Sequence, residues 1–116
     1  MKQKVSDYIA DHIAEWGIRD VFTVTGGGAM HMNDAFGHHP KLHCTYQHHE
    51  QACAMAAEAY ARMDNRMAAV CVTTGPGATN AITGVLGGWM DSIPMLVFSG
   101  QARYATTVAA SGLKLR

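Results

Sequence analysis

Three groups of residues in this sequence have the types and spacing needed to bind or activate a ligand. The first is Glu50, the acid near the start of an alanine-rich stretch from Gln47 to Met63. A carboxylate can accept a hydrogen bond from a ligand ring. The other two groups are glycine turns, which let a ligand approach the backbone and offer it N–H groups. These turns are Gly26, Gly27 and Gly28, and Gly75-Pro76-Gly77 followed by Ala78, Thr79 and Asn80.

Each of the three groups follows a segment that predicts a short β-strand. Residues 20–24 are β-branched and aromatic, residues 42–46 alternate between apolar and polar, and residues 68–73 form a nearly continuous apolar run. The last pattern is typical of a strand covered on both faces. A fourth strand is predicted at 94–99. The remaining periodic segments predict helices at 5–16, 29–36, 47–63 and 78–90.

Alternation of strands and helices predicts an α/β domain with a parallel sheet and right-handed crossovers. We expect a doubly wound, flavodoxin-like sheet of about four strands, with helices on both faces, in one domain spanning residues 1–116. Residues 101–116 are expected to form a loop, so that the last strands of the sheet are missing. Ligands bind at the carboxyl edge of such sheets. All three groups should lie there, with Glu50 in a first helical turn whose dipole favours the ionised carboxylate.

Composition excludes several classes of function. Nine Lys and Arg balance nine Asp and Glu, and no basic run is present, which argues against nucleic acid or an anionic membrane as partner. No apolar run approaches the ~20 residues of a membrane span, and the N-terminus does not resemble a signal peptide. The three cysteines form no CxxC pair, so buried reduced thiols and a cytoplasmic location are expected. They are Cys44, Cys53 and Cys71.

Competing motifs are incomplete. The turn at 26–28 has His31 where a dinucleotide fingerprint needs its third glycine, and the turn at 75–77 lacks the Lys-Ser/Thr of a P-loop. The helix around Glu50 has Cys53 in place of the second histidine of a zinc-protease motif. Six histidines fall within nineteen residues, but nothing in their spacing fixes a tetrahedral set. We therefore predict no metal site in this chain.

Four motifs follow one another along the chain. They are Val21-Phe22 to Gly28-Ala29, His49-Glu50-Gln51-Ala52 continuing to Tyr60-Ala61-Arg62, Thr74-Gly75-Pro76-Gly77-Ala78-Thr79-Asn80, and Met90-Asp91-Ser92-Ile93-Pro94 through Ser99-Gly100-Gln101. Together they resemble the pyrimidine-binding (PYR) domain of thiamine-diphosphate-dependent enzymes, in the acetolactate synthase-like branch. Most acetolactate synthases have a Pro-Gly-Gly turn after the first strand, where this chain has Thr25-Gly26-Gly27-Gly28, so the resemblance does not fix the substrate.

The resemblance implies a role for each candidate residue. Glu50 would hydrogen-bond N1′ of the aminopyrimidine ring of thiamine diphosphate, favouring the 4′-imino tautomer that removes the C2 proton of the thiazolium ring. Pro76 and Asn80 would line the pyrimidine ring. The turn of Gly26, Gly27 and Gly28 would lie beside the active site. The implied activity is carboligation or decarboxylation of a small 2-keto acid.

The resemblance also implies partners. In the family, Mg²⁺ and the diphosphate are held by a pyrophosphate-binding domain of a partner subunit, whose Gly-Asp-Gly…Asn-Asn motif is absent here. We therefore expect a homodimer or higher homo-oligomer, and no turnover by this chain alone. Some acetolactate synthases also bind FAD, which nothing in this sequence supports. The helix of Glu50 and the helix carrying Gly84, Gly87 and Gly88 either form the subunit contact or pack within the domain.

Two other functions remain open on the residues alone. One is a non-catalytic, flavodoxin-like module that binds a nucleotide or flavin at the same glycine-turn edge. The other is a stand-alone assembly domain whose Ala/Gly-rich helices dimerise. Only the enzyme hypothesis requires a catalytic role for Glu50. A Glu50→Gln substitution that abolishes cofactor activation and leaves the fold intact would therefore favour the enzyme over the assembly domain.

Overall fold

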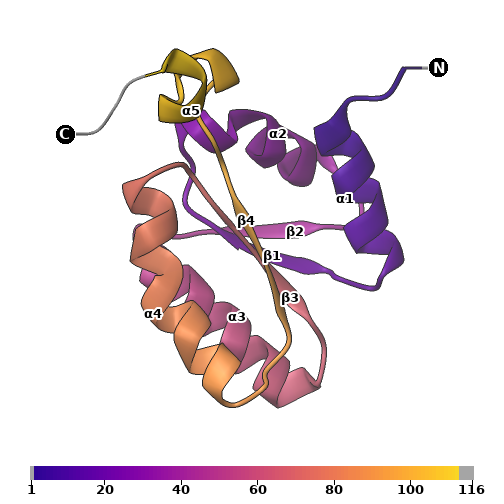
Figure 1. Cartoon of the computed structure of the whole chain (residues 1–116). Helices are drawn as coiled ribbons and strands as arrows, with labels where there is room; N and C mark the ends of the chain where they lie inside the picture. Colours follow the sequence, from indigo (N-terminus) through magenta and orange to yellow (C-terminus); the bar gives the residue numbers. More distant parts are fainter. Residues whose placement is uncertain (1, 113–116) are drawn as a thin grey trace.

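The computed structural model describes residues 2–112 as a parallel β-sheet flanked by helices (Figure 1). The strands are β1 (Asp20–Thr23), β2 (His43–Tyr46), β3 (Ala68–Val72) and β4 (Met95–Ser99). They are arranged in the order β2-β1-β3-β4, and every neighbouring pair is parallel. This is the order of a flavodoxin-like sheet. The predicted fold class is confirmed.

Two pairs of helices cover the two faces of the sheet. Helices α1 (Val5–Glu15) and α2 (Met30–His38) lie on one face, and α3 (Glu50–Asp64) and α4 (Pro76–Met90) lie on the other (Figure 1). Successive strand residues point to opposite faces, so the central strand β3 serves two separate cores. Its Ala69 and Cys71 pack with α1 and α2, while its Ala68, Val70 and Val72 pack with α3 and α4. All five β3 residues are buried, as the apolar run predicts.

Two helices begin two or three residues away from their predicted starts. Helix α3 begins at Glu50 rather than Gln47, because His49 has extended backbone angles (φ −150°, ψ 126°). Helix α4 begins at Pro76 rather than Ala78. Proline suits the first helical turn, and Gly75 before it adopts φ +60°, which glycine tolerates.

A further difference from the prediction lies after β4. The predicted loop instead contains a 3₁₀ turn, η2 (Tyr104–Thr106), and a one-turn helix, α5 (Val108–Ser111). The hydroxyl of Thr107 accepts a hydrogen bond from the backbone N–H of Ala110 at 3.3 Å, which caps this short helix. The prediction for residues 113–116 falls outside the part of the chain that the structure describes.

The small residues of α3 and α4 let these two helices pack closely inside the domain. A Cβ added at Gly84 would lie 2.6 Å from the Cβ of Ala54 and 3.1 Å from the carbonyl oxygen of Gln51. Gly88 similarly lies under the side chain of Met95. The buried faces of the two helices are therefore explained by packing within one chain. Their outer faces remain available for another contact.

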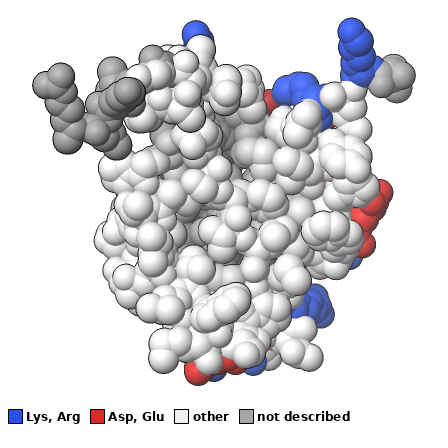
Figure 2. Space-filling view, in the orientation of Figure 1, with Lys and Arg blue, Asp and Glu red and all other residues white. Residues whose placement is uncertain are grey.

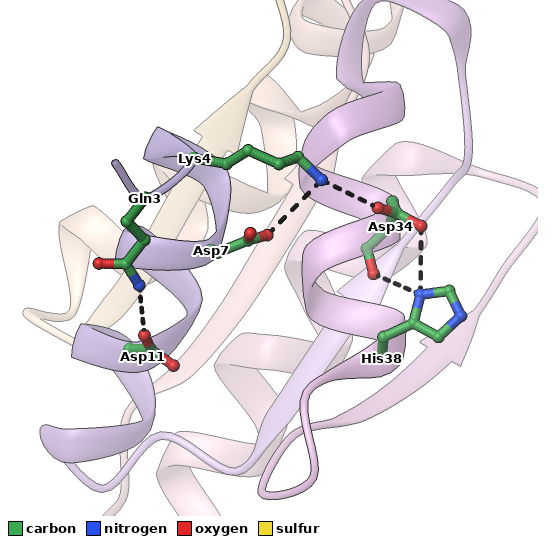
Figure 3. A network of polar contacts seen from close by, with 6 residues as sticks. All are labelled: Gln3, Lys4, Asp7, Asp11, Asp34 and His38. Carbon is green, nitrogen blue, oxygen red and sulfur yellow. Dashed lines mark hydrogen bonds and ion pairs between the residues drawn. The ribbon is translucent and has the colours of Figure 1, made fainter. Parts of the chain in front are cut away.

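Exposed polar contacts join α1 to α2 (Figure 3). Lys4 Nζ lies 3.4 Å from Asp34 and 3.8 Å from Asp7, and the ring of His38 lies 3.1 Å from Asp34. Gln3 donates a hydrogen bond to Asp11 at 2.7 Å. Exposed ion pairs of this kind contribute about 0–1 kcal/mol each. The apolar core beneath them, with Ile13 and Phe36, therefore holds these two helices in place.

The cysteines provide a chemical test of this packing. Burial raises the pKa of the Cys53 thiol to about 11 and that of the Cys71 thiol to about 11, while the half-buried Cys44 has a pKa raised for the same reason. Thiolates are the reactive form. We expect a maleimide to label Cys44 first, and to label Cys53 and Cys71 only on unfolding. Mass spectrometry after timed labelling checks this. Early labelling of Cys53 in the folded chain would contradict the packing of α3.

Candidate functional site

The first turns of α3 and α4 meet at the carboxyl edge of the sheet and line a hollow of about 370 Å³. Both helices follow strands that end at this edge, so their N-terminal residues are brought together from positions about thirty residues apart. The structure thus places three predicted site residues, Glu50, Pro76 and Asn80, in one hollow. Gly77 and Thr79 complete its lining.

A hydrogen bond fixes the orientation of the Glu50 carboxylate. The side-chain amide of Asn80 donates to Glu50 Oε2 at 2.6 Å. This bond and the backbone N–H of Glu50 lower the pKa of the carboxyl below its ordinary value, and the partial burial of Glu50 only partly opposes them. Glu50 is therefore ionised at neutral pH. Its carboxylate can accept a proton or an N–H hydrogen bond from a ring held in the hollow.

Removal of the Asn80 amide should raise the pKa of Glu50. In Asn80→Ala the largest cause of the lowered pKa is lost, so the carboxyl should titrate closer to its ordinary value. A depressed pKa stabilises the fold above the unfolded-state pKa, and this contribution disappears as pH falls through the folded-state pKa. Asn80→Ala should therefore lose less stability than the parent chain upon acidification. ¹³C NMR titration of Glu50 Cδ measures the shift, and an unchanged pKa would contradict the bond.

Thr73 explains why several turn residues are glycine. A Cβ at Gly26 or at Gly77 would lie 2.7 Å from Thr73 Cγ2, and the N–H of Gly28 donates to Thr73 Oγ1 at 3.0 Å. These glycines make room for a threonine side chain. Among the glycines of the two predicted site turns, only Gly27 and Gly75 have nothing within 4 Å of an added Cβ. Thr73 was not among the predicted site residues. Its one local signal is its place directly after the buried strand.

The predicted glycine turn after β1 lies on the same edge but lines a second hollow. Gly27 and Gly28 border a cavity of about 260 Å³ together with residues of the loop after β4. Gly26 packs against Thr73 instead. The structure therefore divides the predicted site residues into two groups: Glu50, Pro76 and Asn80 around one hollow, and Gly27 and Gly28 beside another. Gln101 and Arg103, which also line the second hollow, were not predicted.

Another hollow, of about 380 Å³, lies between α1 and α2 and contains more ionisable groups. Its carboxylates are already paired: Asp34 with Lys4 and His38, and Asp11 with His39 at 3.3 Å. Within residues 2–112, no three His, Cys, Asp or Glu side chains come together in a way that could hold a metal ion. Each of these two carboxylates thus already has a partner within the hollow. In the same part of the chain, no helix is long and apolar enough to cross a membrane.

Comparisons with known proteins agree on one family. The family model described as "Thiamine pyrophosphate enzyme, N-terminal TPP binding domain" matches residues 3–113. The chain is 36% identical over 96 residues to the acetolactate synthase large subunit of Lactococcus lactis, which covers 83% of the chain and 17% of that protein. It is 37% identical over 99 residues to acetolactate synthase 2, chloroplastic, of Zea mays. This alignment covers 85% of the chain and 16% of the maize protein. It is 45% identical over 85 residues to the acetolactate synthase large subunit of Buchnera aphidicola subsp. Schizaphis graminum. This alignment covers 73% of the chain and 15% of that subunit. The chain thus spans about one-sixth of the length of these relatives.

Proposed function

The chain belongs to the thiamine pyrophosphate enzymes, as their N-terminal TPP binding domain, and on that premise we propose that it supplies the Glu50 carboxylate that activates the cofactor's aminopyrimidine ring. The single observation that carries the proposal is the ionised Glu50 carboxylate, oriented by Asn80 at 2.6 Å in a hollow lined by Pro76 and Gly77. The parent activity we propose is acetolactate synthase-like carboligation or decarboxylation of a small 2-keto acid.

The residues present fit an aminopyrimidine ring. Glu50 Oε2 already accepts one N–H, and its other oxygen, Oε1, lies 3.6 Å from where a Cβ on Gly77 would be. The Thr73 methyl group takes up the Cβ position of Gly77, so the space for a flat ring is the hollow itself, which Gly77 and Thr79 also line. Pro76 offers the ring an apolar surface. A carboxylate can accept an N–H bond from a ring nitrogen and thereby hold a proton on it.

Bound thiamine diphosphate supplies a thiazolium carbon that adds to the carbonyl of a 2-keto acid. The chain's own part is to orient the ring and to stabilise the proton on its nitrogen. Fixed hydrogen-bond partners act most strongly where water is excluded. The hollow around Glu50 is open to solvent on one side, so we propose that a pyrophosphate-binding domain of a second subunit closes it. That domain would also hold Mg²⁺ and the diphosphate.

The outer face of α4 is the surface we propose for that second subunit. Ile82, Leu86 and Trp89 recur at helical spacing and are 57%, 52% and 81% exposed. Figure 2 shows the surface over α4 without charged side chains, and α4 itself contains none. The same helix carries Pro76 and Asn80 at its start. A domain seated on this apolar face would therefore also reach the open side of the hollow.

An NMR titration of the ¹⁵N-labelled chain with thiamine diphosphate and Mg²⁺ tests the proposed site. We expect weak, saturable shifts of the Glu50, Gly77 and Asn80 amides, and no 2-keto acid turnover. Glu50→Gln should weaken the binding, whereas Glu15→Gln on α1 should not. Shifts elsewhere in the chain, or stronger shifts with a flavin nucleotide, would contradict the proposal. So would robust decarboxylation by the chain alone.

A substitution on α4 tests the partner surface. Ile82→Glu should reduce the oligomeric mass of the protein that carries this domain, because it would bury a charge in an apolar contact. Tyr8→Glu is the matched control, since Tyr8 is 54% exposed on α1, on the other face of the sheet. Analytical ultracentrifugation compares the two. Equal oligomeric masses for the Ile82→Glu variant and the parent would show that α4 is not part of the subunit interface.

A further inference from the structure

A hollow of about 590 Å³ lies at the amino edge of the sheet, opposite the edge that carries Glu50. Its walls are residues 16–19, which connect α1 to β1, and residues 65–67, which connect α3 to β3. Both connections lie on the side of the sheet away from α5 (Figure 1). Because β1 and β3 are parallel neighbours, the two connections enter adjacent strands. A hollow of this volume is large enough for a small organic ligand.

Two residues with left-handed backbone angles shape the hollow. Gly17, just after α1, has φ +87°, and Asn65, just after α3, has φ 49°. Glycine and asparagine commonly end helices in this way, and here each turns the chain from a helix toward a strand. The N–H of Ile18 donates to the carbonyl oxygen of Ile13 at 3.0 Å, and both isoleucine side chains are buried. The wall at residues 16–19 is therefore held by a backbone hydrogen bond and by the core.

Each wall of the hollow carries an arginine, and no Asp or Glu is among the lining residues. Arg19 forms no ion pair within residues 2–112. Its neighbour in sequence, Asp20, is paired instead with the ring of His43 at 3.3 Å. Arg66 is paired through Nε with Asp64 at 3.1 Å, and the ends of its guanidinium group donate no hydrogen bond within the described chain. Both arginines can therefore donate to an anion.

The same hollow has an aromatic side chain at its edge. Trp16 is 70% exposed, although it lines the hollow. An exposed indole offers a face on which a flat aromatic ring can stack. The amide of Asn65 supplies donors and an acceptor for the edge of such a ring, and the half-exposed side chain of Met67 adds an apolar contact. The hollow thus combines groups for an anion with groups for a planar ring.

One effect opposes an anion here. Helices α1 and α3 end at this edge of the sheet, and the carbonyl ends of helices carry partial negative charge. Two of the last carbonyls of α1 are already occupied, by the N–H groups of Gly17 and Ile18. Paired hydrogen bonds from a guanidinium group to a phosphate are stronger than the screened effect of an exposed helix end. An anion with enough oxygens to bind both arginines is therefore favoured, and a phosphate group meets this requirement.

We propose that this hollow binds a nucleoside phosphate, with its phosphate group on Arg19 and Arg66 and its base stacked on Trp16. Arginine binds phosphate oxygens in pairs, and every nucleobase has a face that stacks on an aromatic ring. Two arginines suit a single nucleotide, whereas a nucleic acid chain requires a longer row of cations. The site lies at the edge of the sheet opposite Glu50, so it is separate from the proposed thiamine site and does not depend on it.

Titration of the ¹⁵N-labelled 116-residue chain with adenosine monophosphate tests this site. We expect saturable shifts of the Gly17 and Arg66 amides and of the indole N–H of Trp16. The indole N–H of Trp89, which does not line the hollow, should not shift. Adenosine and inorganic phosphate, titrated separately, should each bind more weakly than the nucleotide, because each lacks one of the two groups that the hollow holds.

Substitutions of opposite expected sign sharpen the test. Arg19→Ala and Arg66→Ala should each weaken binding by about 10-fold to 100-fold, because a hydrogen bond to a charged group is lost. Asp64→Asn should strengthen it by about 2-fold to 5-fold, because Arg66 loses its competing partner. Lys4→Ala is the control: Lys4 is 54% exposed just before α1, at the opposite edge of the sheet, and its loss should leave the affinity unchanged.

The same spectra show whether each variant is folded. Three results would overturn the proposal: shifts that do not saturate, inorganic phosphate or adenosine binding as tightly as the nucleotide, or parental affinity in both arginine variants. An Asp64→Asn variant that binds more weakly than the parent would also contradict the role given to Arg66.

Discussion

Glu50→Gln is expected to reduce the rate of deuterium exchange at C2 of bound thiamine diphosphate by about 10²-fold to 10⁴-fold. This rate is to be measured in the protein that carries this domain, together with the pyrophosphate-binding domain that we propose as its partner. A glutamine can still accept a hydrogen bond from Asn80 but carries no charge to stabilise a proton on the ring nitrogen. The loss should therefore appear in the exchange rate, followed by NMR, while the fold is retained.

Glu15→Gln makes the same chemical change at a distance and serves as the control. Glu15 lies at the end of α1, where its carboxylate is 65% exposed and lies 2.9 Å from His12. In the Glu15→Gln variant, the rate of deuterium exchange at C2 of the bound cofactor should equal the rate in the parent protein. If Glu50→Gln also exchanges at the parental rate, while circular dichroism shows both variants folded, then the carboxylate has no part in activation.

Gly84→Ala should lower the free energy of unfolding by about 1–3 kcal/mol, the usual cost of overpacking a tightly packed contact. The added methyl group would lie 2.6 Å from Ala54 Cβ and 3.0 Å from the backbone nitrogen of Met55, so α3 and α4 would have to separate. Helix propensity alone predicts the opposite sign, since alanine is favoured over glycine by about 1 kcal/mol in a helix interior. Urea denaturation therefore distinguishes the two effects by sign.

Gly87→Ala gives the matched comparison on the same helix. Its added methyl group would meet only the carboxylate of Glu58, at 3.1 Å, and that flexible side chain can move away. We expect this variant to be as stable as the parent or more stable, by up to about 1 kcal/mol. A Gly84→Ala variant as stable as Gly87→Ala would show that the helices are not in close contact at Gly84.

The order of elements could be predicted because it is a local property of the chain. The apolar run at residues 68–73 and the alanine-rich stretch around Glu50 each indicate their secondary structure within a short window. The boundaries depended on single backbone angles. The extended His49 moved the start of α3 to Glu50, and the short α5 falls in a segment where no pattern predicts a helix.

The contacts that shape the site could not be predicted in the same way. The bond between Glu50 and Asn80 joins residues thirty positions apart, and its length depends on how α3 and α4 pack. The glycines illustrate the difference. The sequence predicts that they let a ligand approach the backbone, but in the structure Gly26 and Gly77 accommodate the side chain of Thr73. Sequence pattern identifies where the chain turns, whereas the neighbours at the turn come only from the tertiary fold.

The protonation state of the cofactor ring tests the central claim most directly. With thiamine diphosphate ¹⁵N-labelled at N1′, the chain should raise the pKa of N1′ above its value in free solution, because the ionised Glu50 carboxylate favours a proton there. The Glu50→Gln chain should not raise it. The pKa of N1′ is compared in three samples: the free cofactor, the cofactor saturated with the parent chain, and the cofactor with the Glu50→Gln chain. The same pKa in all three would contradict the assignment of Glu50 as the residue that activates the cofactor.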